Sequence, residues 1–470
     1  MKLHSKNLLS LFGFDALNRV LAFASTAYLA RVLGNEGFGI INFGLAVLAY
    51  GVLFSSLGLQ TIGTRMVAPP DSESRLIVRR ITLLRLFLSI PVAIFIVLTT
   101  IQFSRSAATQ GVVLLYAASL FPMVMQIEWY YQGKEKIGVI GINRAAASVV
   151  FFLGVIVIVR SPADIQLVPI TFFLGSCVNT VLLFATFLRA PSQHAGQPND
   201  HPEYDWLSLL RTSVPIGLAS VLSQVVFNLP LLLLGAFAST ADLGNYAAAS
   251  KSIFFLLAID RAIYFLVFPL AARTHSTNPE ALPHQMSRIL KYTLILSIPV
   301  AVGGAVTSRE LFSVIYGSGY ENSSLVFQVL CSFFLFTVIN SLFAYLLIAV
   351  GKEKVYSSIV TNLSVLIVVG LVPLTYISKA TGAATGLAIG EFCVMMLMYR
   401  EAAKVAQLHF LSAALKPLCS SVVMAGAAYW MLQFGLIAAI ISGVFVYGAS
   451  ILLTRGFSRD DLNYLKERFI

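Results

Sequence analysis

Long apolar segments separated by short polar ones occupy almost the whole chain. A helix that crosses a bilayer needs about 20 mostly apolar residues, and fourteen segments of this 470-residue sequence are suitable. They are residues 8–31, 38–64, 81–101, 110–131, 138–159, 167–188, 213–238, 246–272, 292–308, 323–350, 356–377, 380–400, 417–434 and 436–454. The pattern therefore predicts an all-α polytopic membrane protein with about fourteen transmembrane helices. Twelve or thirteen is the alternative count, because the first segment carries charges and only Gly435 separates the last two.

A hydrophilic segment with several prolines, residues 189–212, is the longest connection and lies near the midpoint of the chain. The tetrapeptide Gly133–Lys136 recurs as Gly351–Lys354, each time after the fourth span of its half. We therefore expect two pseudo-symmetric six-helix lobes around a central cavity, followed by two extra helices. The expected divisions are an N-terminal lobe, a cytoplasmic linker, a C-terminal lobe, and the two extra spans with a cytoplasmic tail, at residues 1–190, 191–212, 213–400 and 401–470.

The composition agrees with this pattern. Hydrophobic residues make up 58% of the chain and charged residues 11%, whereas soluble domains carry about 25% charged residues. The net charge of +11 lies in short gaps between apolar segments, which disfavours a nucleic-acid binder with one basic face. If the N-terminus is cytoplasmic, 22 of the 32 Lys and Arg residues fall on the cytoplasmic side and 5 on the opposite side. This bias predicts that both termini are cytoplasmic.

A few charges lie inside the predicted spans, where each costs several kcal/mol unless it faces a cavity or a partner. The cations are Arg19, Arg85, Arg144, Lys251 and Arg261, and the carboxylates are Asp15, Glu128, Asp260 and Glu391. We expect Arg85 to snorkel to the surface, and Glu128 to have a structural role beside neighbouring aromatic residues. Arg19, Arg144, Lys251 and Arg261 are the candidate ligands of an anionic substrate, because Arg can hold a phosphate with two parallel hydrogen bonds.

Several of these charges have a second interpretation. Asp15 and Arg19 are four residues apart and can form an ion pair within one helix, and Arg144 can snorkel or act as an inner gate. Lys251 and Arg261 differ by about 80° around an unbroken helix, and Asp260 points roughly away from Lys251. Asp15, Asp260 and Glu391 are candidates for binding a coupling H⁺ or Na⁺, or for pairing with a neighbouring helix.

The sequence contains no P-loop motif, no metal-spaced cluster of histidines or cysteines within a span, and no outer loop large enough for a catalytic domain. We therefore expect neither an enzyme nor a metal site, and no cofactor apart from a coupling ion.

Four short motifs occur in order along the chain, and each is weak on its own. They are ARVLGNEGFG at Ala30–Gly39, EWYYQGKEK at Glu128–Lys136, LFSVIYGSGY at Leu311–Tyr320 and TGAATGLAIGE at Thr381–Glu391. Together they resemble the polysaccharide transporter family, the Wzx-type O-antigen and exopolysaccharide flippases of the multidrug/oligosaccharidyl-lipid/polysaccharide flippase superfamily. Gly386 departs from the family pattern, which usually has alanine there.

The resemblance implies a V-shaped, two-lobed bundle that moves an undecaprenyl-pyrophosphate-linked oligosaccharide across the bacterial cytoplasmic membrane by alternating access. The cargo would be an O-antigen, capsule or exopolysaccharide repeat unit, and a cation-coupled small-molecule exporter is the alternative. Arg19 matches a cavity arginine of the related peptidoglycan-precursor flippases. The expected partners are the lipid-linked oligosaccharide, membrane lipids and polysaccharide polymerase or assembly proteins, with no nucleic acid, and the protein is expected to be a monomer.

Overall fold

A computed structural model describes residues 2–69, 72–103, 106–189 and 205–457, and all regular elements among these residues are helices. The backbone is described throughout these ranges, but the side chains of residues 2–12, 15–16, 219, 221–227, 261–262 and 264–266, which include Asp15 and Arg261, lie outside the described part. The chain forms two compact units, residues 1–244 and 245–470. Most of the predicted linker at 191–212 falls outside the described residues, so the predicted domain division stays a prediction.

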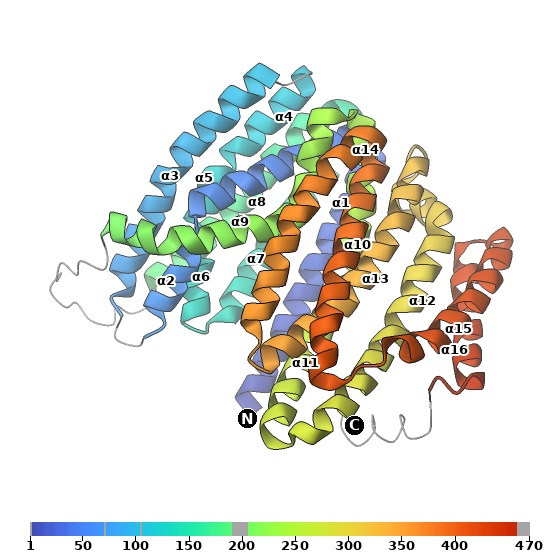
Figure 1. Ribbon diagram of the computed structural model, residues 1–470. Coiled ribbons are helices and arrows are strands. Elements are labelled where there is room, and N and C mark those ends of the chain that lie inside the picture. Colours follow the sequence, from blue (N-terminus) through green and yellow to red (C-terminus); the bar gives the residue numbers. More distant parts are fainter. Residues whose placement is uncertain (1, 70–71, 104–105, 190–204, 458–470) are drawn as a thin grey trace. The chain divides into compact units, whose positions relative to one another are not determined.

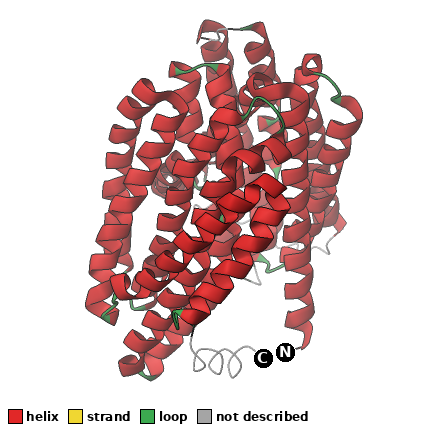
Figure 2. Cartoon of the chain, turned by 90° about the vertical axis from the view of Figure 1, so that its right-hand side faces the viewer, coloured by secondary structure: helices red, strands yellow, loops and turns green. Residues whose placement is uncertain are grey.

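The first unit is a bundle of helices (Figure 1), and Figure 2 shows that helices dominate the described chain. Its elements are α1 (Lys2–Ser56), α2 (Leu59–Val67), α3 (Ser74–Phe103), α4 (Ala107–Ala118), α5 (Leu120–Met125), α6 (Glu128–Gly133), α7 (Ile137–Ile158), the 3₁₀ helix η1 (Pro162–Gln166), α8 (Leu167–Arg189) and α9 (Trp206–Phe237). Its core includes Trp129, Tyr130 and Tyr131 of α6, which pack among aliphatic side chains of α2 and α3.

The second unit begins within α10 and continues to the C-terminus. Its elements are α10 (Thr240–Leu256), α11 (Ala258–Thr277), the 3₁₀ helix η3 (Pro279–Ala281), α12 (Leu282–Tyr316), α13 (Glu321–Ala349), α14 (Glu353–Ala406), α15 (Phe410–Met431), the 3₁₀ helix η4 (Leu432–Phe434) and α16 (Leu436–Leu453). Tyr447 of α16 donates a hydrogen bond to the Ile295 carbonyl of α12 at 2.7 Å. This bond fixes α16, one of the two predicted extra helices, against α12.

Ten helical segments are long and apolar enough to cross a membrane, counted over the described residues. The predicted all-α, multi-pass membrane protein is thereby confirmed, whereas the count of fourteen stays a prediction. Two helices, α1 and α14, are long enough for two crossings, since they contain 55 and 54 residues. Helices of this length extend over about 80 Å, whereas a bilayer core is about 30 Å thick. Each contains one residue with non-helical backbone, Gly34 in α1 (φ 67°) and Lys379 in α14 (φ 51°). Gly34 lies in the connection that the sequence predicts between its first two spans.

Three predicted spans are interrupted in ways that the apolar pattern does not show. The predicted span 38–64 is divided at Leu57 and Gly58, which both have positive φ. The predicted span 110–131 becomes α4, α5 and α6, and the predicted span 246–272 becomes parts of α10 and α11 with a break at Leu257. Pro122 contributes to the second interruption, because proline has no N–H to continue the helical hydrogen bonds. Each break lies within a segment that is apolar on average, and single polar residues such as Ser119 and Gln126 do not lower its hydropathy enough to mark a boundary.

Candidate functional site

Helix breaks in the first unit leave backbone groups that need partners from elsewhere. The turn from α1 to α2 uses Gly58 at φ 80°, and a Cβ there would lie 2.5 Å from the Ser213 carbonyl oxygen of α9. Glycine is therefore required both by the left-handed conformation and by the close approach of α9. The second break separates α5 from α6 at Gln126, whose extended backbone (φ −59°, ψ 127°) turns its carbonyl away from a helical hydrogen bond.

Arg85 of α3 joins these two breaks. Its Nη1 donates to the Gln126 carbonyl at 3.0 Å, and its Nη2 donates to Ser56 Oγ, at the end of α1, at 3.3 Å. The side chain is fully buried, with an exposed fraction of 0%. The expectation that Arg85 snorkels to the surface is therefore wrong. The broken helices provide it with buried hydrogen-bond acceptors, whereas the carbonyls of an unbroken helix are already bonded within the helix.

An ion pair lies close to the same break. Arg144 of α7 makes a bidentate contact with Glu128, the first residue of α6, with Nε to Oε1 at 2.9 Å and Nη2 to Oε2. Asn179 of α8 also donates to Glu128 Oε1, at 3.3 Å. The Arg144 side chain is 54% exposed, whereas that of Glu128 is 15% exposed. The arrangement is a half-buried carboxylate that orients a more accessible guanidinium, and bidentate geometry of this kind fixes the plane of an arginine.

Arg19 lies at a similar level to Arg144 on a neighbouring helix. A Cβ on Gly141 of α7 would lie 3.3 Å from Phe14 Cβ of α1, and Tyr28 of α1 donates to the Val159 carbonyl at 2.9 Å. These contacts show that the first part of α1 runs parallel to α7. Counting residues from them places Arg19 and Arg144 within about 9 Å of each other along the helix axes. Arg19 is half-buried.

The second unit brings two of the predicted carboxylates into contact with α13. Asn340 donates to Glu391 Oε1 of α14 at 3.0 Å, and Tyr345 donates to Asp260 Oδ2 of α11 at 3.4 Å. The two carboxylates are close enough to interact electrostatically. Asp260 Oδ1 and Asn340 Oδ1 are buried acceptors without a hydrogen-bond partner among the described residues. Unsatisfied oxygens of this kind are suited to a proton or a small cation.

The remaining predicted site residues have simpler placements. Lys251 is half-buried on α10. Asp260 follows the break at Leu257, where its N–H donates to the Leu257 carbonyl at 3.1 Å in a tighter i to i+3 turn. The angles predicted for Lys251, Asp260 and Arg261 around one unbroken helix therefore do not apply. The side chains of Asp15 and Arg261 lie outside the described part, and the roles of all the predicted site residues stay predictions.

Sequence reasoning missed Ser56, Gln126, Asn179, Asn340 and Tyr345 as partners of the charged residues. One signal was available, because Asn340 and Tyr345 are polar positions about one and a half turns apart in the otherwise apolar span 323–350. No signal in the sequence shows that the carbonyl of Gln126 is released by a break. Metal-type clusters of three or more His, Cys, Asp or Glu residues do not occur in the described part of the chain.

Comparison with known sequences identifies similar proteins over most of the chain. Residues 5–275, more than half of the sequence, match the model of the polysaccharide biosynthesis protein family. A protein of Escherichia coli (strain K12) named "Putative O-antigen transporter" is 22% identical over 410 residues, which cover 84% of this chain and 95% of the relative. The protein of the same name in Shigella dysenteriae is 21% identical over 405 residues, covering 84% of this chain and 99% of the relative.

Comparison with solved structures shows the fold. The lipid II flippase MurJ, in an inward closed conformation, has a TM-score of 0.70 at 14% identity, covering 95% of this chain and 98% of that chain. An inward-facing multidrug resistance transporter of the MATE family, in the MOP superfamily, has a TM-score of 0.64 at 12% identity, covering 83% of this chain and 94% of that chain. At such low identities the likeness extends to the fold alone.

Proposed function

The chain belongs to the polysaccharide biosynthesis protein family, and from this premise we propose that it flips an undecaprenyl-pyrophosphate-linked oligosaccharide across the bacterial cytoplasmic membrane by alternating access. The family resemblance predicted from the sequence motifs is confirmed. The relatives carry the names of transporters and flippases rather than of enzymes, which supports the expectation of a transporter. The proposal includes both termini on the cytoplasmic side, a monomer, and passage of the cargo to polysaccharide assembly proteins.

The observation that supports this function best is the Arg144 guanidinium. It lies eight residues into the 22-residue helix α7, about 10 Å from the start of the helix at the usual rise per residue. An arginine at that depth with about half of its side chain exposed would be costly if it faced lipid, so we place it on a water-filled cavity. Arginine is well suited to hold a pyrophosphate there. Arg19 at a similar level, and Lys251 and Arg261 in the second unit, are the further proposed ligands.

The alternative is a cation-coupled exporter of small molecules. Asp260 and Glu391 would suit the binding of a cationic drug, and the multidrug transporter shares the fold. In the first unit, however, Arg85 and Arg144 outnumber the single carboxylate of Glu128 in the cluster between them. A net positive cluster favours an anionic cargo, and the family membership agrees with it.

Coupling to an ion is the second part of the proposal. We place the binding of H⁺ or Na⁺ at Asp260 and Glu391, because two carboxylates, the Asn340 amide oxygen and the Tyr345 hydroxyl provide the oxygen atoms that such ions prefer. Buried oxygens without hydrogen-bond partners support this placement. Asp15 remains a further candidate on the basis of the sequence alone.

Export of glycan in a bacterial strain that lacks its own flippase tests the first part. We expect Arg144→Ala, Arg19→Ala and Arg261→Ala to reduce surface polysaccharide strongly while the protein still inserts into the membrane. Arg160→Ala is the matched control, because this exposed arginine lies after the end of α7 and donates to the Val157 carbonyl. Normal surface polysaccharide in all three variants would refute the proposed cationic cavity, and resistance to cationic drugs without glycan export would favour the exporter.

Flipping in proteoliposomes under an imposed Na⁺ or pH gradient tests the second part. We expect the double variant Asp260→Asn/Glu391→Gln to flip substrate at a rate that no longer depends on either gradient. Glu401→Gln is the matched control, since this carboxylate near the end of α14 pairs only with Lys404 among the described ion pairs. Gradient dependence that survives in the double variant would exclude the two carboxylates as the coupling site.

A further inference from the structure

A pocket of about 380 Å³ lies between α12 and α15 in the second unit. This volume is within the range of small-molecule sites. Two facing helices provide most of its lining at spacings of three and four residues, which place side chains on one helix face. The lining residues on α12 are Ser287, Leu290, Lys291 and Ile295, and those on or next to α15 are His409, Ser412, Ala413, Lys416 and Pro417.

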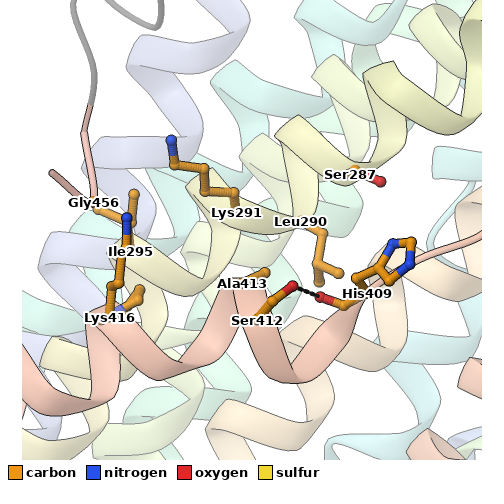
Figure 3. A pocket seen from close by; sticks show the side chains of 10 residues that line it. Ser287, Leu290, Lys291, Ile295, His409, Ser412, Ala413, Lys416 and Gly456 are labelled. Atoms are coloured by element: carbon orange, nitrogen blue, oxygen red, sulfur yellow. Dashed lines mark hydrogen bonds between the residues drawn. The ribbon is translucent and has the colours of Figure 1, made fainter.

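Two lysines reach this pocket from different helices. The helices run in the same direction, because Ile295 and Pro417 line one pocket and, farther along, a Cβ on Gly303 would lie 3.4 Å from Met424. Lys416 also donates to the Arg455 carbonyl, just after α16, at 3.2 Å. Figure 3 shows Lys291 and Lys416 at one end of the pocket and His409 at the other. The position of Lys416 is thus fixed at the point where three helices meet.

The lining combines cations and hydroxyl groups with apolar side chains. Ser287 and the His409 ring offer hydrogen bonds, whereas the Ser412 hydroxyl donates to the His409 carbonyl at 3.0 Å. Ile295 and Ala413 are half-buried and apolar. No acidic residue is among the described residues that line the pocket. The pocket also includes the first turn of α15, where the helix dipole adds partial positive charge. Such a pocket is complementary to an anion that carries an apolar portion.

We infer that this pocket binds an anionic glycerophospholipid of the surrounding membrane, with the phosphate between Lys291 and Lys416. Basic pockets between transmembrane helices are suited to anionic headgroups. The half-buried, apolar Ile295 and Ala413 fit the glycerol and ester portion, which a free phosphate lacks. Leucines with large exposed fractions lie close by, at 78% for Leu411 and 84% for Leu453, and offer an apolar surface to acyl chains. This inference does not depend on the proposed function.

Native mass spectrometry of the purified full-length protein tests the inference, with phosphatidylglycerol and phosphatidylethanolamine as separate probes. We expect retained phosphatidylglycerol, and an affinity roughly 25-fold lower for Lys291→Gln/Lys416→Gln, since each lysine at an anionic surface contributes about fivefold. Lys291→Arg/Lys416→Arg should retain binding. Lys352→Gln/Lys354→Gln, which removes the same charge elsewhere in the second unit, is the matched control and should bind like the wild type.

Three results would overturn the inference. The first is equal retention of phosphatidylglycerol by Lys291→Gln/Lys416→Gln and the wild type. The second is an equal loss in the control Lys352→Gln/Lys354→Gln, which would show a general effect of surface charge. The third is inorganic phosphate binding without lipid and displacing phosphatidylglycerol completely, which would make the pocket a site for free phosphate. Thermal unfolding of each variant shows whether it is folded. If Lys291→Gln/Lys416→Gln is unfolded, Lys291→Arg/Lys416→Arg still tests the inference, because it should retain phosphatidylglycerol.

Discussion

The Glu128–Arg144 pair allows a substrate ligand to be distinguished from a purely structural ion pair. Removing the guanidinium with Arg144→Gln leaves a carboxylate that is only 15% exposed without its main partner. Hydrogen bonds to charged groups contribute about 1.5–3 kcal/mol each. Because Arg144 is 54% exposed, solvent screening reduces this value, and we expect the free energy of unfolding to fall by about 2 kcal/mol. Glu128→Gln should cost a similar amount.

The neutral double variant Glu128→Gln/Arg144→Gln separates the two roles. It leaves no uncompensated charge in the pair. A variant that exchanged the two charges would instead place a cation at position 128, close to Arg85. We expect the two single effects on stability to be non-additive by about 1–2 kcal/mol in a double-mutant cycle, so that the double variant is nearly as stable as either single variant. Export should behave differently, because the proposed pyrophosphate ligand is absent in both Arg144→Gln and the double variant but present in Glu128→Gln.

The loss of a bidentate phosphate contact, at about 3 kcal/mol, lowers substrate affinity roughly 150-fold. The assay combines surface polysaccharide on gels with the free energy of unfolding in detergent by chemical denaturation. We expect export to be as low in the double variant as in Arg144→Gln and clearly higher in Glu128→Gln, although the three variants have similar stability. If Glu128→Gln loses as much export as Arg144→Gln, the loss of export follows the loss of the ion pair, and the proposed role of Arg144 as a substrate ligand is wrong.

Three further variants and one control variant test the helix breaks. Arg85→Lys should lower the free energy of unfolding by about 2 kcal/mol, because an ammonium keeps the buried charge but cannot reach both acceptors; an unchanged value would contradict the proposed bridging role. Gly58→Ala should lower the free energy of unfolding by at least about 2 kcal/mol because of the positive φ and the clash with α9. The control Gly370→Ala, with open space around its Cβ position, should be neutral or slightly stabilising. Equal effects of the two substitutions would contradict the geometry. Lys379→Gly should raise the thermal unfolding midpoint, because φ 51° and ψ −128° are strained for lysine, and a lower midpoint would show that its side-chain contacts matter more than the strain.

The family and the membrane-spanning, all-helical architecture could be predicted from the sequence. A bilayer imposes long apolar segments on any helix that crosses it, and this constraint is local, so hydropathy reveals it. The connection at Gly34 was predictable for the same reason, since its polar neighbours Asn35 and Glu36 interrupt the apolar pattern. The unusual charges of the spans, including Arg144 and Glu391, were visible as exceptions to that pattern.

The partners of those charges are decided only by the tertiary structure. Arg85 is buried because its acceptors, Ser56 and Gln126, lie at breaks in helices far from it in the sequence. A break inside an apolar segment changes no hydropathy value, so no local pattern reports the carbonyl that it releases. Likewise, Lys291 and Lys416 are unremarkable basic residues in the sequence, and only the packing of α12 against α15 brings them to one pocket. The sequence determines which groups must find a partner, because the bilayer penalises each of them; the packing determines which partner each one finds.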